Sequence, residues 1–354
     1  MSRPRRYLLI AGLLALAGLV ALSWQAFRHF NPNFFDTETV DAGELAKLKG
    51  AALTPPPAGT DWPRFRGPNN DGIASADHFN TDWDAKQPTE AWKTPCGGGY
   101  GSVAVADGRV YVQDRNGGNE RLLCLSAADG KHLWADEYPA DYSVFQAGFA
   151  DGPRATPTVH DGRAYTVGAV GQFRCLKLNG DSPPTLLWEH DLHAEFGGDM
   201  GNGKSQWGHA CSPLVEGQLV IVQPCGKRAA VAAFDRTTGE QRWAVGSSVG
   251  GYSSPVAATF GGVRQVVAVT GDSVLGIGVP DGKKLWEHPW VTQHKVNAAS
   301  PVVAGEFVFV SSEYHKGCVL LRVDAGGVRP VFFKPKDKGM KTKHSTVVHR
   351  DGFV

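Results

Sequence analysis

Short apolar runs separated by glycine turns recur along most of this chain. A first run ends at a turn such as Asp107-Gly108, and an alternating or β-branched run such as 219–222 follows it. Runs of this kind are typical of β-strands. A third run comes next, followed by a second glycine turn and a last run that carries an aromatic residue. The pattern therefore predicts units of four antiparallel strands.

Two landmarks define the repeat. Trp134 follows Ser102 by 32 positions, and Trp243 follows Ser212 by 31. The hydroxyl landmarks are Ser102, Thr156, Ser212, Ser254, Ser300 and Ser345; the aromatic landmarks are Trp92, Trp134, Trp188, Trp243, Trp286 and Phe332. Such regular spacing indicates structural repeats, and four strands per repeat describe a propeller blade. We predict an all-β propeller of four-stranded antiparallel blades, in which the aromatic residues pack between neighbouring blades.

The edges of the repeat pattern are uneven. Trp92 matches the last strand of a blade whose other strands do not precede it, and Ser345 opens a sixth repeat that stops at Val354. An unaccompanied last strand such as the one that carries Trp92 normally completes the final blade of a closed ring. We expect five complete blades and a sixth begun, within a ring of eight. The propeller then spans 61–354 and is incomplete at its C-terminus.

The N-terminal segment, 1–28, has a different character. Three arginines precede an uncharged run at 7–27, and its mostly apolar part, 7–24, is near the lower length limit for a membrane-spanning helix. Basic residues before the run favour a cytoplasmic N-terminus. We predict a single-pass cell-membrane protein with its propeller on the periplasmic side. A cleaved signal peptide is the alternative, since Ala21 and Ser23 are small.

Residues 29–60 lack a steady hydrophobic period and include three consecutive prolines, so a flexible linker is predicted there. The net charge of +1 comes from 36 basic and 35 acidic residues, which argues against a nucleic-acid partner. The 44 glycines suit a chain with many tight turns. Six cysteines are scattered without a C-x-x-C pair, which excludes a zinc ribbon or an attached haem.

One stretch carries a family resemblance. Residues 233–243, Ala-Phe-Asp-Arg-Thr-Thr-Gly-Glu-Gln-Arg-Trp, closely resemble the repeat signature of pyrroloquinoline-quinone-like propellers. The opening at 62–72, followed by Gly97-Gly98-Gly99-Tyr100, looks like the start of a bacterial extracytoplasmic branch of that family. The resemblance covers about 61–354. It implies the fold but leaves the function open, because the family includes quinone-dependent dehydrogenases and an outer-membrane assembly lipoprotein that acts as a scaffold.

The resemblance also implies what an active quinone site needs. Family enzymes hold the quinone between a tryptophan floor and a disulfide of adjacent cysteines, with a calcium bound by Glu, Asn and Asp and an Asp as base. No two cysteines are adjacent here, and no calcium-ligand set maps onto the sequence. We therefore expect neither pyrroloquinoline quinone nor calcium, and no catalytic residues. A quinone-dependent dehydrogenase is the alternative function.

Two connections between repeats are about ten residues longer than the rest, at 139–155 and 189–211. Both fall on the same face of a propeller, and loops on a rigid scaffold commonly bind partners. The residues at the starts of the inner strands vary between repeats: Tyr100, Arg154, His209, Tyr252, Asn297 and His344. We name Trp207, His209, Tyr252 and Asn297 as candidates for binding a protein or glycan partner.

The second connection also carries titratable side chains. His190 and His193 with Asp191 and Glu195 are residue types that hold zinc or calcium, but glycine-rich polar loops commonly have this composition, so a solvated loop is the preferred interpretation. Ser205, His209 and Asp199 have the residue types of a hydrolase triad. No nucleophile elbow accompanies them, so the sequence does not support a hydrolase site. We predict a non-enzymatic binding or scaffolding module without a metal. A cofactor-free sensor domain is a further possibility.

Overall fold

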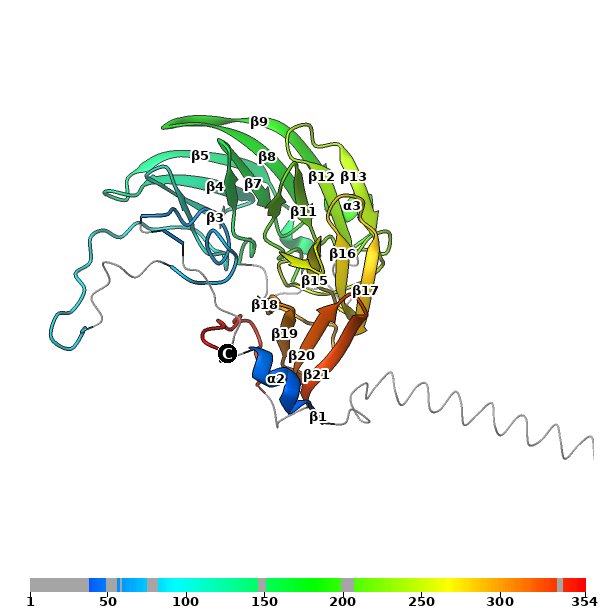
Figure 1. Ribbon diagram of the computed structural model, residues 1–354. Helices are drawn as coiled ribbons and strands as arrows, with labels where there is room; N and C mark the ends of the chain where they lie inside the picture. Colours follow the sequence, from blue (N-terminus) through cyan, green and yellow to red (C-terminus); the bar gives the residue numbers. More distant parts are fainter. Residues whose placement is uncertain are drawn as a thin grey trace, which may run out of the picture.

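The computed structural model describes residues 38–48, 56–57, 59–74, 82–145, 151–198, 207–335 and 340–354. Within them the chain forms five antiparallel sheets, which fan out in chain order along an arc (Figure 1). Each sheet contains four consecutive strands and corresponds to one predicted repeat. The prediction of an all-β chain built from four-stranded antiparallel sheets is confirmed. The total of eight blades stays a prediction.

The sheets are numbered here as blades 1 to 5. Blade 1 contains β2 (Ala104–Ala106), β3 (Arg109–Asn116), β4 (Asn119–Ser126) and β5 (His132–Pro139). Blade 2 contains β6 (Thr158–His160), β7 (Arg163–Val167), β8 (Gln172–Asn179) and β9 (Ser182–Asp191). Blade 3 contains β10 (Leu214–Glu216), β11 (Leu219–Val222), β12 (Val231–Asp235) and β13 (Gln241–Val245). Blade 4 contains β14 (Val256–Phe260), β15 (Val263–Val269), β16 (Ser273–Gly278) and β17 (Lys284–Pro289). Blade 5 contains β18 (Val302–Ala304), β19 (Phe307–Ser312), β20 (Gly317–Asp324) and β21 (Gly327–Pro335).

The hydroxyl landmarks link neighbouring blades, because the backbone N–H of one landmark donates to the side-chain hydroxyl of the next. The amide N–H of Ser102 donates to Thr156 Oγ1 at 3.0 Å, and that of Thr156 donates to Ser212 Oγ at 2.9 Å. The series continues from Ser212 to Ser254, from Ser254 to Ser300, and from Ser300 to Thr346. We call this series the hydroxyl relay. It corrects one sequence assignment, because the sixth landmark is Thr346 and not Ser345.

The tryptophans pack across blade boundaries. A β-carbon placed on Gly130 would lie 2.5 Å from the Trp92 ring, and one on Gly282 would lie 2.6 Å from that of Trp243. The Trp134 indole N–H donates to Gly180 O, and Trp188 covers Gly239. Trp286 donates instead to Gln265 of its own blade, and half-buried Phe332 pairs with Val40. Trp92 itself lies outside any strand of the described residues, which differs from its predicted place in a last blade strand.

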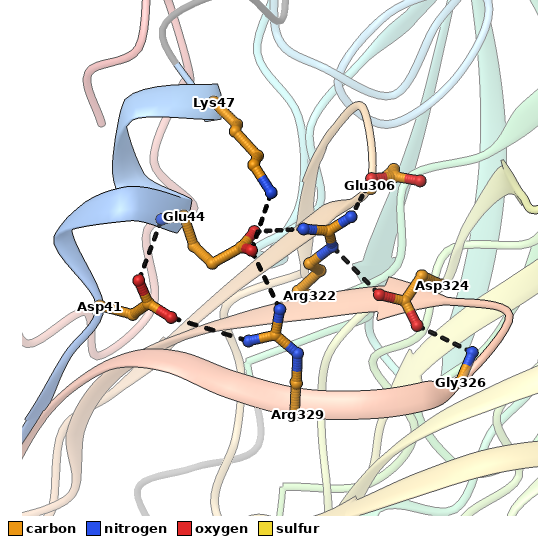
Figure 2. A network of polar contacts seen from close by, with 8 residues as sticks. All are labelled: Asp41, Glu44, Lys47, Glu306, Arg322, Asp324, Gly326 and Arg329. Atoms are coloured by element: carbon orange, nitrogen blue, oxygen red, sulfur yellow. Dashed lines mark hydrogen bonds and ion pairs between the residues drawn. The ribbon is translucent and has the colours of Figure 1, made fainter.

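Part of the predicted linker is ordered. β1 (Thr39–Val40) pairs with β21 as a fifth strand of blade 5, and α2 (Ala42–Leu48) follows it. Leu45 and Leu48 pack on the apolar core of the blade. The Glu44 carboxylate accepts hydrogen bonds from Lys47, Arg322 and Arg329 (Figure 2). Residues 38–48, which we call the strap, therefore correct the prediction of a flexible linker over 29–60.

A second N-terminal segment runs across the blades near the turns that end the inner strands. Trp62 bridges to Val105 of blade 1, and the Val159 N–H of blade 2 donates to Pro63 O at 2.7 Å. Arg64 reaches Val215 O of blade 3. Segment 61–73 therefore contacts the inner strands at the end away from the predicted site, since Tyr100 precedes Val105 by five positions, about 17 Å for an extended chain. Within the described residues no helix is long and apolar enough to span a membrane, and the predicted span at 7–27 lies outside them.

Candidate partner-binding mouth

The starts of the inner strands and the two long connections meet at one end of the blades. We call this region the mouth and define it by residues 97–101, 139–145, 151–155, 207–210 and 250–253. Tyr100 is its most exposed aromatic residue, at 57%. Arg154 and Trp207 are half-buried, whereas Tyr252 and His209 are buried. The mouth therefore presents aromatic and cationic side chains above a closely packed floor.

The glycines of 97–101 allow two backbones to approach closely. A β-carbon on Gly97 would lie 2.1 Å from Arg115 O, and one on Gly98 would lie 1.9 Å from Asp151 O. The Tyr100 N–H donates to Pro153 O at 2.8 Å. This segment is thus held between β3 and the end of the first connection. A larger residue at either glycine would push the connection away from blade 1.

A buried carboxylate lies beneath the first connection. Glu120 is 0% exposed and accepts hydrogen bonds from Tyr138 Oη at 2.5 Å, from Tyr142 Oη and from the Ala169 N–H at 2.9 Å. Tyr142 belongs to η1 (Tyr142–Val144) in that connection. Burial and the neighbouring Glu120 charge raise the pKa of both phenols, so they stay protonated and donate. Glu120 thereby connects blade 1, the first connection and blade 2.

Arg154 lies among aromatic rings at the start of blade 2. Its guanidinium carbon is 5.2 Å from the Tyr100 ring centroid and 5.8 Å from that of Phe145, within cation–π range. Burial lowers the pKa of Arg154, although a guanidinium stays charged in proteins. Tyr100 Oη donates to Asp151 at 2.6 Å. The Arg154 guanidinium, the Asp151 carboxylate and the exposed Tyr100 ring therefore lie together at one point of the mouth.

Two sequence candidates pack together across blades. The Trp207 and Tyr252 rings make an edge-to-face contact with centroids 5.5 Å apart. The Tyr252 N–H donates to Asn297 O at 2.9 Å, which holds this backbone in place. Burial raises the pKa of the Tyr252 phenol, so it stays neutral. The half-buried Trp207 indole is the part of the pair that a partner can reach.

His209 lies deeper in the mouth than the sequence indicates. It is 7% exposed, and burial together with nearby His193 lowers its pKa to about 4, so it is neutral at pH 7. Its N–H donates to Ala169 O at 2.8 Å. The buried Nε2 atom has no hydrogen-bond partner within the described part of the chain. His209 therefore belongs to the buried floor of the mouth and not to its exposed rim.

Asn297 belongs to the core of blades 4 and 5, which corrects its assignment as a binding residue. Its side chain is 0% exposed. The amide nitrogen donates to Thr270 O at 2.7 Å and to Trp290 O at 3.2 Å, and the amide oxygen accepts from Ser312 Oγ at 2.8 Å. Because the amide is fully engaged and buried, it offers no surface to a partner.

The two histidines of the second connection have different surroundings. His190 hydrogen-bonds to Glu195 and to Gly239 O, whereas His193 lies on α3 (Leu192–Phe196) beside Gly171 and Gly198. Among the described residues, no three His, Cys, Asp or Glu side chains come together around an ion position. Asp199 and Ser205 lie outside the described residues, so the structure does not describe the arrangement of the triad that they would form with His209.

Sequence reasoning missed Glu120, Tyr138, Tyr142 and Phe145. One signal was present, because Glu120 shares a strand face with Leu122 and Cys124, both buried. A carboxylate at a core-facing position needs hydrogen-bond partners. Those partners come from another strand, a connection and a second blade, and no local pattern reveals such an arrangement.

Repeated blades, a hydroxyl relay across their inner strands and a loop-built mouth at one end define a β-propeller. The family model of outer membrane protein assembly factor BamB matches residues 73–151 and 118–349, and this chain belongs to that family. The predicted resemblance to pyrroloquinoline-quinone-like propellers is confirmed. No curated protein sequence matches the chain.

Solved structures show the same fold. BamB from Moraxella catarrhalis is similar with a TM-score of 0.51 and 16% identity, covering 74% of this chain and 73% of that one. Quinohemoprotein alcohol dehydrogenase from Comamonas testosteroni has a TM-score of 0.54 and 14% identity, covering 83% and 52%. A europium-containing methanol dehydrogenase has a TM-score of 0.51 and 14% identity, covering 80% and 56%. This chain therefore spans little more than half of the two dehydrogenases. Likeness at this identity shows the fold alone.

The described residues do not fit a quinone centre of the expected kind. All six cysteines are unpaired, and five of them are buried. We therefore derive no redox step for this chain.

Proposed function

We propose that this protein is a membrane-tethered, extracytoplasmic propeller that binds a partner protein through its mouth without catalysing a reaction. The observation that supports it most directly is the meeting of both long connections at one end of the blades. That end exposes Tyr100 and part of Arg154 and Trp207, residue types that are enriched at protein interfaces. The tether follows from the apolar run at 7–27.

The scaffold suits such a role. Hydrogen bonds of the hydroxyl relay fix the inner strands, and segment 61–73 contacts them at the end away from the mouth. Loops held on a rigid frame lose little entropy when they bind. The family name describes an assembly factor, which favours a protein over a glycan as the partner.

Site-specific photocrosslinking in native membranes tests this proposal on the full chain. A photoreactive residue at Tyr100 should give one discrete protein adduct, and Arg154→Ala should reduce its yield. The control is a photoreactive residue at Leu187, which is exposed on the last strand of blade 2, β9, and is not one of the mouth residues. Equal adducts from both positions would contradict a specific mouth, and protection by soluble glycans alone would favour a glycan partner.

A second experiment addresses the alternative function. The purified full chain is incubated with pyrroloquinoline quinone and calcium, and the absorption spectrum is recorded after gel filtration. We expect no quinone to remain with the protein. Uptake of one quinone per chain would overturn the non-enzymatic proposal.

A further inference from the structure

The two long connections contact a common set of groups inside the mouth. Tyr142 of the first connection donates to Glu120, and its ring lies 5.0 Å from that of Phe145, edge to face. Phe145 in turn packs on the second connection, because a β-carbon on Gly208 would lie 2.7 Å from its ring and 2.2 Å from Ala169 O. Only glycine fits that position, where φ is also positive at 73°.

A second route between the connections runs through the backbone N–H and C=O of one residue of blade 2. The Ala169 N–H donates to Glu120 Oε1 at 2.9 Å, and the Ala169 carbonyl accepts from the His209 N–H at 2.8 Å. Gly168 permits this approach, since a β-carbon there would lie 2.1 Å from Glu120 Oε2. Hydrogen bonds to a buried carboxylate are stronger than neutral ones, because the charge is poorly solvated.

From these contacts we infer that Glu120 is a positioning residue that couples the two connections into a single binding unit. The inference rests on the proposed function, in which the mouth receives the partner. Glu120 lies below the surface and does not touch the partner. A change at one connection therefore alters the other through Glu120, Ala169 and Phe145.

Hydrogen exchange of the full chain tests this coupling without any partner. Tyr142→Phe removes one donor to Glu120 from the first connection and keeps the ring. We expect faster exchange at 140–145 and also at the His209 amide, on the order of tenfold, as for loss of a hydrogen bond to a charged group. The matched control is Tyr138→Phe, which removes the other phenol donor but lies on β5, outside both connections. It should leave the His209 amide within about threefold of the unmodified protein.

Arg154 provides a second, chemical readout. Its modification rate with phenylglyoxal, followed by mass spectrometry, should rise in Tyr142→Phe because Phe145 beneath the guanidinium loosens. Arg242 on β13 is exposed and reports any general change in reactivity. Exchange within β15 and β16 reports global unfolding.

Three outcomes would overturn the inference. An increase in amide exchange that is confined to 140–145 in Tyr142→Phe would show that the connections are independent. An equal response in Tyr138→Phe, or a uniform rise that includes β15 and β16, would show a general loss of stability. If Tyr142→Phe unfolds the chain, Glu120→Gln, which keeps the shape, repeats the test with the same readouts. Crosslinking at Tyr100 can fail while this coupling holds, so the two proposals are separable.

Discussion

At the scale of single residues, small hydroxyl side chains determine how blades join. Ser212, Ser254 and Ser300 are all buried, and each accepts an amide N–H from the preceding blade. Each such bond satisfies a backbone group that water cannot reach. A hydroxyl is the smallest side chain that can do so where inner strands crowd together. This explains why Ser or Thr recurs once per repeat.

Replacing one relay hydroxyl should destabilise the protein measurably. Ser254→Ala leaves the buried Ser212 N–H without its acceptor, which costs about 1–3 kcal/mol. Ser102→Ala is the control, because Ser102 is exposed and contributes its backbone N–H to the relay; a change within about 0.5 kcal/mol is expected. Urea unfolding measures both. Equal effects of the two substitutions would show that the relay hydroxyls stabilise nothing.

The relay also shows what the sequence could and could not predict at this scale. The nearly constant spacing of 31 or 32 positions from each hydroxyl to the next aromatic landmark identified these residues, because each must occupy the same place in its blade. The sequence could not reveal that the sixth landmark is Thr346, since Ser345 and Thr346 are both hydroxyl residues. It also could not distinguish Asn297, whose amide is consumed by Thr270, Trp290 and Ser312. Those partners are known only once blades 4 and 5 are in place.

At the scale of elements, strands and turns were predictable, whereas the strap was not. Asp107 and Gly108 both have positive φ, as a two-residue hairpin turn requires, and the flanking runs alternate. β1 has two residues and α2 has seven, which is too little sequence for a period to be recognised. The strap folds because β21 has an open edge that pairs with β1, and because Arg322 and Arg329 donate hydrogen bonds to the Glu44 carboxylate.

The attachment of the strap should depend on pH. Hydrogen bonds from Lys47 and Arg322 lower the pKa of Glu44 from 4.5 to about 2. Because the folded pKa is the lower one, the stabilisation is complete above pH 4.5 and is lost as the pH falls towards 2. Amide protection at 39–48 should therefore decrease over that window in the unmodified protein.

Two variants make this prediction specific to the strap. Glu44→Gln should lower protection at 39–48 already at neutral pH and remove most of its change between pH 4.5 and 2. Glu306→Gln is the control, because Glu306 pairs with the same Arg322 at 3.0 Å but lies outside the strap. Identical pH profiles for Glu44→Gln and the unmodified protein would disprove a role for this carboxylate.

At the scale of the whole molecule, one arginine joins distant parts of the chain. Arg66 donates to Thr346 O at 3.1 Å and to Val347 O at 2.8 Å, 280 and 281 positions away along the chain. It also binds Asp71 O and Asn70 O within its own segment. One planar guanidinium thus connects segment 61–73 to the residues that follow blade 5. The predicted membrane tether and partner remain predictions at this scale.

Arg66→Lys should separate these two parts of the chain while keeping the charge. A lysine ammonium has three donors on one atom and cannot reach all four carbonyls that the guanidinium reaches, and bonds from charged donors contribute about 1.5–3 kcal/mol each. We expect a loss of about 2–4 kcal/mol in urea unfolding, with faster amide exchange at 346–350. Arg64→Lys, which removes a single 3.3 Å bond to Val215 O, should cost less. If Arg66→Lys lowers stability while exchange at 346–350 is unchanged, Arg66 supports only its own turn.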